Sequence, residues 1–379
     1  MSKNVLITGG AGFIGSNLAL KLVERGYKVT ILDNLSEQIH GQNAEITSTL
    51  YLSIKDKVNF IKGSVTSKAM WEKSIENQDS IIHLAAETGT GQSMYEIQKY
   101  VDVNIVGTSI LLDILANTKH SIKKIVVASS RAIYGEGKYE CVKHGFVYPT
   151  ERSEDDLSKA NFECLCPICN SLLKLHPTSE DSLIHPTSIY GITKQTQEQM
   201  VLVAGKSLSI PTVAFRYQNV YGPGQSLKNP YTGILSIFST QIKNNNNINI
   251  FEDGKESRDF VYIEDVVDAT ILGLEKESAN YKSFNVGYGK PIDVITVAKK
   301  LKQVYSSNIE IKISGNYRRG DIRHNYADTS KISNLLDYKA KWNFSNGIKE
   351  FCKWVNIQDV ESDRYSQSII ELKEKGLFK

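Results

Sequence analysis

The sequence lacks the features that mark membrane, secreted and nucleic-acid-binding proteins. Its 379 residues carry 45 Lys and Arg against 42 Asp and Glu, so the net charge of +3 draws it neither to nucleic acid nor to an anionic membrane. We find no apolar run of membrane-spanning length and no signal peptide. Five cysteines, three of them within residues 164–169, do not make a secreted disulfide framework. These absences predict a cytoplasmic protein with reduced thiols and ample length for a core.

What the sequence does contain is a glycine-rich turn near its start, V-L-I-T-G-G-A-G-F-I-G at residues 5–15. Residues 5–8 predict a short buried strand, and Gly9, Gly12 and Gly15 turn the chain into a helix that begins near Phe13. Glycine allows a tight turn and a close approach of the backbone to a pyrophosphate, and the helix N-terminus offers unpaired N–H groups to it. The stretch therefore predicts a dinucleotide-binding turn.

The residues that follow support this prediction. The helix ends at Gly26, a second strand spans residues 28–32, and Asp33 stands at the end of that strand. There a carboxylate accepts the hydroxyls of the adenosine ribose and repels the extra phosphate of NADP, so the predicted cofactor is NAD. A flavodoxin-like turn that binds no dinucleotide is the weaker alternative.

Further strands and helices alternate along the first part of the chain. Continuous apolar strands separated by helices predict an α/β fold with a parallel sheet that is covered on both faces, a doubly wound sheet of Rossmann type. The predicted strands are residues 58–62, 80–84, 124–128 and 212–216, and the predicted helices are residues 92–118 and 188–208. After this the alternation is lost, which predicts an NAD-binding domain at residues 1–218 and a smaller substrate-binding lobe at residues 219–379.

Residues that carry chemistry gather at Tyr190 and Lys194, four residues apart on one predicted helix. They share a helix face, so the ammonium is expected to lower the pKa of the phenol toward neutrality and to hold a ribose hydroxyl. A phenolate takes a proton from a sugar hydroxyl while hydride leaves the same carbon. Ser130, after the fifth strand, is the expected hydroxyl beside that phenol, and Ser129 is its rival. The alternative is that the Tyr and Lys are exposed on the surface and have no catalytic role.

With these residues the chain resembles the extended short-chain dehydrogenase/reductase superfamily, the sugar nucleotide epimerases and dehydratases. The resemblance covers nearly the whole chain. It rests on T-G-G-A-G-F-I-G at 8–15, H-L-A-A at 83–86, S-S-R-A-I-Y-G at 129–135, Y-G-I-T-K at 190–194, F-R-Y-Q-N-V-Y-G-P-G at 215–224, R-D-F-V-Y-I-E-D-V at 258–266 and F-N-V-G at 284–287.

The resemblance implies roles for individual residues. The catalytic trio would be Ser130, Tyr190 and Lys194. The cofactor would contact Gly9, Gly12, Phe13, Ile14, Gly15, Asp33, Asn34, Ser64, Val65, Leu84, Ala85, Ala86, Tyr190 and Lys194. A nucleotide-diphosphate sugar would contact Thr88, Ser130, Arg131, Asn219, Arg258 and Arg318, the last two neutralising the phosphates. Ser64 departs from the acid usual at its position, which leaves its contact with adenine in doubt. Residues 88–93 are either a flexible segment near the sugar or a structural loop.

The residues beside the trio decide the reaction. The 4,6-dehydratases of the superfamily place an Asp-Glu pair directly after the hydroxyl residue, whereas this chain has Arg131 and Ala132. The resemblance therefore implies an NAD-dependent 4-epimerase, closest to the dTDP-L-rhamnose 4-epimerase group and acting on a dTDP-6-deoxyhexose as a homodimer. A UDP-hexose or UDP-uronate 4-epimerase, a 4-dehydrogenase or reductase that releases a keto sugar, and an NAD-binding regulator stay open as alternatives.

Residues 136–186 form an insertion of about fifty residues that a compact member of the superfamily does not need. It contains Cys141 and His144 in C-V-K-H, and Cys166 and Cys169 in C-P-I-C. Two ligand pairs of this spacing predict a closed, structural zinc site in a zinc-ribbon-like loop. Cys164 is a spare thiol, and free cysteines are the alternative.

Overall fold

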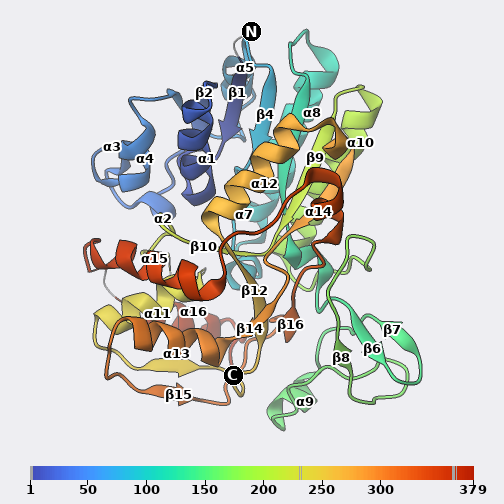
Figure 1. The fold of residues 1–379 in the computed structure, drawn as a ribbon, viewed down its shortest axis with the longest axis vertical. Helices are drawn as coiled ribbons and strands as arrows, with labels where there is room; N and C mark the ends of the chain where they lie inside the picture. Colours follow the sequence, from blue (N-terminus) through green and yellow to red (C-terminus); the bar gives the residue numbers. More distant parts are fainter. Residues whose placement is uncertain (1–2, 230, 232, 361–362, 364) are drawn as a thin grey trace.

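The computed structural model describes residues 3–229, 231, 233–360, 363 and 365–379, and in these residues a seven-stranded parallel sheet forms the centre (Figure 1). The strand order is β13-β9-β5-β4-β1-β2-β3. The bounds are β1 Asn4–Thr8, β2 Lys28–Asp33, β3 Asn59–Lys62, β4 Ser80–His83, β5 Lys124–Ser130, β9 Thr212–Tyr217 and β13 Lys282–Val286. The order runs outward from β1 in both directions, which confirms the predicted Rossmann-type sheet.

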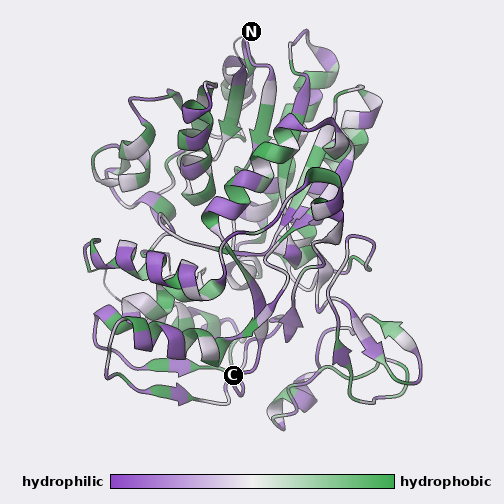
Figure 2. Ribbon diagram, viewed as in Figure 1, coloured by the Kyte–Doolittle hydropathy of each residue, from purple (hydrophilic) through white to green (hydrophobic). Residues whose placement is uncertain are grey.

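Helices cover both faces of this sheet because side chains alternate along the buried strands. Val5 and Ile7 of β1 pack with Leu18 of α1 (Phe13–Glu24) and Val267 of α12 (Ile263–Glu275). Leu6 faces the other way, into a core shared with α5 (Lys68–Ile75), α8 (Gly107–Asn117) and α10 (Ile189–Ser207). The central strands are accordingly hydrophobic along most of their length, whereas the helices carry hydrophobic and polar residues together (Figure 2).

The predicted helix at residues 92–118 is interrupted in the structure. It consists of α6 (Thr90–Ser93), α7 (Ile97–Val101), a π-helical turn η1 (Asp102–Val106) and α8. The buried Asn104 in the π turn accepts a hydrogen bond from the Glu87 backbone N–H (2.8 Å) and donates to Thr193 Oγ1 (2.9 Å). Such wide turns occur at functional sites, and this one ties the loop after β4 to α10.

The stretch Ile97–Asn117 corrects one expectation from the sequence, because its 21 residues and mean hydropathy of 1.2 meet the length and composition of a membrane span. Core helices of globular proteins pass the same test. Here Leu111 and Leu112 of α8 lie in the core against the sheet. We therefore interpret the stretch as a core helix.

The second half of the chain builds a smaller lobe and also returns to the sheet. The lobe contains β10 Asn219–Tyr221, α11 Ile234–Lys243, β11 Ile248–Ile250, β12 Ser257–Tyr262, β14 Pro291–Asp293, α13 Val294–Val304, β15 Ile311–Ile313, β16 His324–Asn325, α15 Phe344–Asn356 and α16 Tyr365–Glu374. Strand β13, which we did not predict, completes the central sheet after this excursion, and α12 packs on the face of α1. The predicted division at residue 218 stays a prediction.

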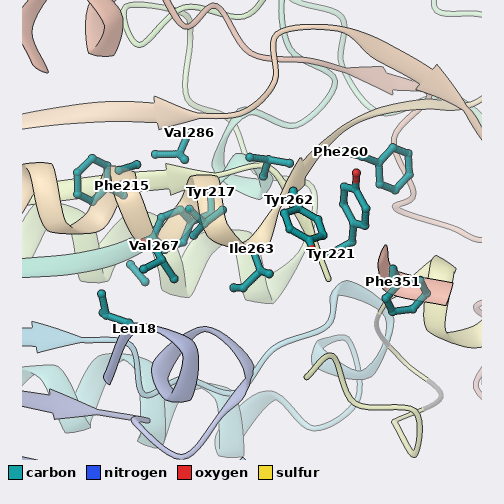
Figure 3. Close-up of a cluster of buried hydrophobic side chains, with 14 of the residues drawn as sticks. Leu18, Phe215, Tyr217, Tyr221, Phe260, Tyr262, Ile263, Val267, Val286 and Phe351 are labelled. Carbon is teal, nitrogen blue, oxygen red and sulfur yellow. The ribbon is translucent and has the colours of Figure 1, made fainter. Parts of the chain in front are cut away.

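Aromatic side chains join the lobe to the sheet. Phe215 and Tyr217 of β9 stack with ring centroids 6.0 Å apart, and Tyr221 meets Tyr262 at 5.5 Å and Phe260 at 6.3 Å (Figure 3). These rings belong to one continuous core that runs from α1 to α15. The lobe is thus fixed against the carboxyl ends of the strands by packing rather than by a thin linker.

The insertion forms a small separate unit, at the lower right of Figure 1. Its three antiparallel strands follow the order β7-β6-β8, with β6 Tyr139–Cys141, β7 Gly145–Val147 and β8 Lys174–Leu175, and its helix α9 spans Glu154–Ser158. Its core consists mainly of Tyr139, Cys141, Val147, Cys164 and Cys166. The remaining short elements are α2 Glu37–His40, α3 Ala44–Thr47, α4 Thr49–Ile54, η2 Arg131–Tyr134, η3 Glu277–Ala279 and α14 Ser330–Leu336.

Candidate active site

A cavity of about 550 Å³ lies at the carboxyl ends of the central strands and continues into the lobe. Every residue that the sequence predicted for the cofactor or the substrate lines this cavity, from Gly9 at one end to Arg318 at the other. The structure therefore brings all of these residues together. Their individual roles stay predictions.

Gly9 and Gly15 let the glycine turn pack closely against the protein's own backbone. Gly9 has φ of +67°, and a Cβ there would lie 2.7 Å from the backbone nitrogen of Ala85. A Cβ at Gly15 would collide with the Gly9 carbonyl oxygen. The first turn of α1 carries no acidic residue, so its N–H groups and positive dipole end remain open to an anion. The turn fits the pyrophosphate of a dinucleotide.

Asp33 ends β2 at the cavity wall. Its two carboxylate oxygens accept hydrogen bonds from the backbone N–H groups of Ala11 (3.0 Å) and Leu35 (2.8 Å). A carboxylate oxygen accepts two hydrogen bonds, so each retains capacity for a ribose hydroxyl. Burial raises the pKa of Asp33, against these hydrogen bonds and the nearby His40. His40 Nε2 lies 4.0 Å from the carboxylate, a neighbour that no sequence signal indicated.

The Ser64 hydroxyl, in contrast, already hydrogen-bonds to the nearby Thr66. It lies 2.8 Å from Thr66 Oγ1 and accepts a hydrogen bond from the Thr66 backbone N–H at 3.1 Å. Ser64 lines the cavity, but its side chain closes a turn of its own.

The predicted trio meets where β5 ends beside α10. Ser130 is the last residue of β5, and Tyr190 and Lys194 lie in the first two turns of α10, which Ser188 caps. The Ser130 hydroxyl accepts a hydrogen bond from the Ala132 N–H (3.2 Å) and is close enough to the Tyr190 phenol to influence its pKa. The rival Ser129 also lines the cavity, but its buried hydroxyl has no hydrogen-bond partner among the described residues.

One electrostatic expectation was wrong for the protein alone. Burial raises the pKa of Tyr190, against the Ser130 hydrogen bond and the charge of Arg131, whereas the sequence predicted that Lys194 would lower it. Burial also lowers the pKa of Lys194 to about 7, opposed by Glu198. The Lys194 ammonium donates to Gln197 Oε1 rather than to the phenol. Both groups are desolvated together, which helical spacing cannot reveal.

The segment at residues 88–93 is held in place. Ser93 Oγ accepts a hydrogen bond from the Tyr190 backbone N–H (3.0 Å), and the Thr88 carbonyl accepts one from the Tyr100 hydroxyl (2.7 Å). The Tyr100 ring stands edge-on to Tyr190 with centroids 6.4 Å apart. These contacts favour the structural reading of this segment.

The lobe supplies two cations and an acid to the far end of the cavity, and η2 supplies a third cation, Arg131. Asp321 lies between Arg258 Nη2 (3.4 Å) and Arg318 Nη2 (3.0 Å). Burial alone would raise the pKa of Asp321, but the two arginines lower it. Arg131 Nε donates to Asn219 Oδ1 (2.7 Å), and because arginine only donates, the Asn219 amide N–H groups face away from it. Burial and the charge of Arg258 lower the pKa of Arg131 to about 9.

The sequence reasoning also missed Asp321, Glu256 and Gln218, which line the cavity. Asp321 stands in the motif R-R-G-D and was available to it, whereas Glu256 and Gln218 carry no signal. Glu256 Oε2 and both amide atoms of Gln218 are buried without a hydrogen-bond partner in the part of the chain that the structure describes. Burial raises the pKa of Glu256 to about 7. These atoms are positioned to bind polar groups of a ligand.

The insertion brings its four predicted ligands together, and none of them lines the cavity. The Sγ atoms of Cys141, Cys166 and Cys169 and a ring nitrogen of His144 all lie within 4.8 Å of one another. His144 Nδ1 is 3.5 Å from Sγ of both Cys141 and Cys166. Cys164 lies outside this group, and burial raises its pKa.

Comparisons with known proteins agree with this geometry. A family model described as GDP-mannose 4,6 dehydratase matches residues 6–150, and one described as NAD dependent epimerase/dehydratase family matches residues 169–287. A dTDP-L-rhamnose 4-epimerase of Burkholderia thailandensis is 35% identical over 355 residues, 93% of this chain and 95% of the relative. The chain belongs to the NAD-dependent epimerase/dehydratase family. It is an NAD-dependent sugar nucleotide epimerase, which confirms the enzyme class expected from the sequence.

Solved structures of similar epimerases cover nearly the whole chain. A UDP-glucose 4-epimerase of Thermotoga maritima with UDP-glucose has a TM-score of 0.75 at 28% identity and covers 93% of this chain and 98% of its own. A UDP-glucuronic acid 4-epimerase of Bacillus cereus in complex with UDP-glucuronic acid and NAD has a TM-score of 0.75 at 26% identity, covering 93% and 99%.

We expect this epimerase to bind NAD at least about tenfold more tightly than NADP, a difference of roughly 1.4 kcal/mol. The reason is the Asp33 carboxylate, which would face the extra phosphate. Calorimetric titration of cofactor-free enzyme with each dinucleotide measures the preference, and Asp33→Asn should narrow it. Equal affinities, or NADP copurifying with the enzyme, would contradict the assignment of Asp33.

Proposed function

We propose that the enzyme is a nucleotide-sugar 4-epimerase acting on a dTDP-6-deoxyhexose such as dTDP-L-rhamnose. The observation that carries this proposal is the meeting of Ser130, Tyr190 and Lys194 in a cavity whose next turn, η2, begins with Arg131 and Ala132. A dehydration of the sugar needs a carboxyl group to protonate the departing hydroxyl, and this turn supplies none.

In the proposed mechanism the protein transfers a proton, and the cofactor would accept and donate the hydride. NAD, when bound in the glycine turn, supplies the hydride acceptor and then the hydride donor at C4. Tyr190 removes the C4 hydroxyl proton, and Ser130 hydrogen-bonds the same oxygen. Burial opposes the loss of the phenol proton, and Ser130 and the positive charge of Arg131 favour it. The keto sugar turns in the cavity and presents the opposite face of C4. Tyr190 returns the proton to the C4 oxygen when the ketone is reduced.

Turning the sugar requires that the diphosphate stays anchored. Arg258 and Arg318 are the proposed anchors, with the amide of Asn219 beside them. Arg318 Nε is buried without a partner among the described residues, so it retains a donor for a phosphate oxygen. Asp321 pairs with both arginines, and the more highly charged diphosphate would replace it as their partner.

The similarity at 35% identity to an enzyme named for dTDP-L-rhamnose supports this substrate over those of the UDP-sugar epimerases at 28% and 26%. A UDP-uronate is the second candidate, because the guanidinium of Arg131 beside Ser130 would complement a carboxylate at C6. A dehydrogenase or reductase that releases the keto sugar is the remaining alternative.

The test is a panel of dTDP-L-rhamnose, UDP-glucose and UDP-glucuronic acid, followed by NMR and by absorbance in the NADH band. We expect dTDP-L-rhamnose to give its C4 epimer with a kcat/KM at least about tenfold above the others, equivalent to roughly 1.4 kcal/mol. NADH should not accumulate. Faster turnover of UDP-glucuronic acid would favour the second candidate, and accumulating NADH would favour the dehydrogenase.

The matched control for this experiment is a pair of phenol deletions. Tyr190→Phe should lower kcat by about 10² to 10⁴ and leave NAD binding intact, because the general base is removed. Tyr100→Phe removes the hydroxyl of the neighbouring tyrosine, which hydrogen-bonds to Thr88 and Gln92. Its kcat should stay within about fivefold of the parental value, which corresponds to the loss of one hydrogen bond. Near-parental turnover by Tyr190→Phe would refute the assignment of Tyr190 as the general base.

We also propose that the enzyme is a homodimer formed through α7, α8 and α10. These helices keep apolar side chains exposed on the surface, among them Val106 at the end of the π turn and Ile192 and Val203 on α10. Exposed apolar residues on neighbouring helices favour pairing with a second copy. Light scattering at micromolar concentration should give twice the mass of one chain, and replacing Val203 with Glu should shift it toward a monomer. A parental monomer would contradict the proposal.

We propose a structural zinc ion in the insertion, held by Cys141, His144, Cys166 and Cys169. Three thiolates and an imidazole make a closed tetrahedral set with no position left for a water molecule. The sulfur and nitrogen atoms are already gathered, and the unit has few other buried apolar residues. A metal would therefore act by folding the insertion and not on the sugar.

Two cysteine variants test this site. The parent enzyme, purified without chelator, should hold about one zinc per chain, and Cys166→Ser should lose it and lower the melting temperature. Cys164→Ser is the matched control, since Cys164 is equally buried but stands outside the ligand group, and it should keep the metal. Well under half an equivalent of zinc in the parent would reject the site.

A further inference from the structure

One short segment of the lobe, residues 318–323, controls both proposed phosphate anchors. It carries Arg318 itself, and it carries Asp321, which pairs with both arginines. Its backbone also fixes Arg258, whose Nη1 donates to the Arg323 carbonyl (2.9 Å) and whose Nη2 donates to the Ile322 carbonyl (2.7 Å). Any shift of this anchor segment therefore moves both guanidinium groups.

The insertion holds the anchor segment through its backbone. Arg152 Nη2 donates to the Asp321 carbonyl at 2.8 Å, and Glu136 Oε2 accepts a hydrogen bond from the Arg323 N–H at 2.7 Å. Arg152 Nε also lies 3.4 Å from Glu136 Oε1, with both side chains at least 95% buried. Buried charged groups with these partners are costly to separate, which fixes the distance between the insertion and the segment.

The insertion also holds the segment through the side chain of Arg323, which is completely buried. Its Nη2 is 2.5 Å from Glu163 Oε1, and its Nη1 is 2.9 Å from Glu252 and 2.7 Å from Asp253. Glu163 belongs to the insertion, whereas the two other acids belong to the lobe. His324 and Arg323 hold the pKa of Glu163 at about 2, so it is ionised at neutral pH.

A further ion pair joins the same parts at the surface. Glu154 of α9 pairs with Arg319 in the anchor segment and with Lys379 at the chain end. Exposed ion pairs of this kind contribute little stability by themselves. This one nevertheless connects the insertion to the same anchor segment. Four charged residues of the insertion, Glu136, Arg152, Glu154 and Glu163, thus converge on residues 318–323.

We infer that the insertion positions the arginines that bind the diphosphate, and that Glu163 is a positioning residue which acts on Arg258 and Arg318 through Arg323. This inference rests on the proposed role of the two arginines. Glu163 does not line the cavity, so its effect on a ligand must pass through the anchor segment. An interaction that is equal in the ground state and the transition state changes KM and leaves kcat unaltered.

The test uses Glu163→Gln in the full-length enzyme, titrated calorimetrically with dTDP and with UDP, which contain the diphosphate without the sugar. We expect the Kd of the diphosphate to rise about three- to tenfold, as for other residues that couple to a site without touching it. KM should rise by the same factor. The value of kcat should stay within about twofold and NAD affinity should not change.

Glu140→Gln is the matched control. Glu140 is a half-exposed carboxylate of the same insertion, 42% exposed against 48% for Glu163, and it also pairs with a histidine, His176 at 2.7 Å. That pair lies entirely within the insertion. Glu140→Gln should leave Kd and KM at parental values, and both variants should keep the parental metal content and fold.

The outcomes separate this inference from the proposed function. Normal binding of the diphosphate by the parent, with no shift in Glu163→Gln or with equal shifts in both variants, overturns the positioning role alone. A fall in kcat with unchanged KM in Glu163→Gln also overturns it. Failure of the parent to bind either dTDP or UDP overturns the anchor assignment and the inference with it.

Discussion

The site depends on one constraint, the parallel direction of the central strands. Because parallel strands end at the same edge, Asp33 at the end of β2, Ser130 at the end of β5 and Asn219 beyond β9 line one cavity although they are far apart in sequence. The lobe then closes the edge through the aromatic core around Tyr221 and Tyr262, which fixes its arginines relative to the trio (Figure 3).

Burial sets the chemistry of this edge. It raises the pKa of Tyr190 and lowers the pKa of Lys194, so neither group is charged as readily as in water. In contrast, Arg152 and Arg323, which hold the anchor segment, form buried ion pairs with Glu252. The enzyme therefore keeps its anchoring charges fixed, whereas the buried phenol is protonated in the protein alone and has to lose and regain one proton during the reaction.

Much of this arrangement was predictable from local sequence. The glycine turn, Asp33 and the Tyr–Lys pair have fixed spacings because each lies within one strand, turn or helix, and the structure gathers them as expected. Strand β13 was missed because the chain reaches it only after the whole lobe. The π turn at Asn104 and the partners of Lys194 depend on contacts between distant elements. The convergence of the insertion on residues 318–323 could not be predicted for the same reason, since charge spacing within the insertion gives no partner.

The central claim is that hydride leaves C4 of the sugar and returns to the same carbon. It is tested most directly with the preferred nucleotide sugar carrying deuterium at C4, incubated in ordinary water with enzyme at catalytic concentration and followed by NMR. We expect the epimer to keep its deuterium at C4, because the label is transferred and returned without exchange with solvent. Epimer that carries hydrogen at C4 would contradict it.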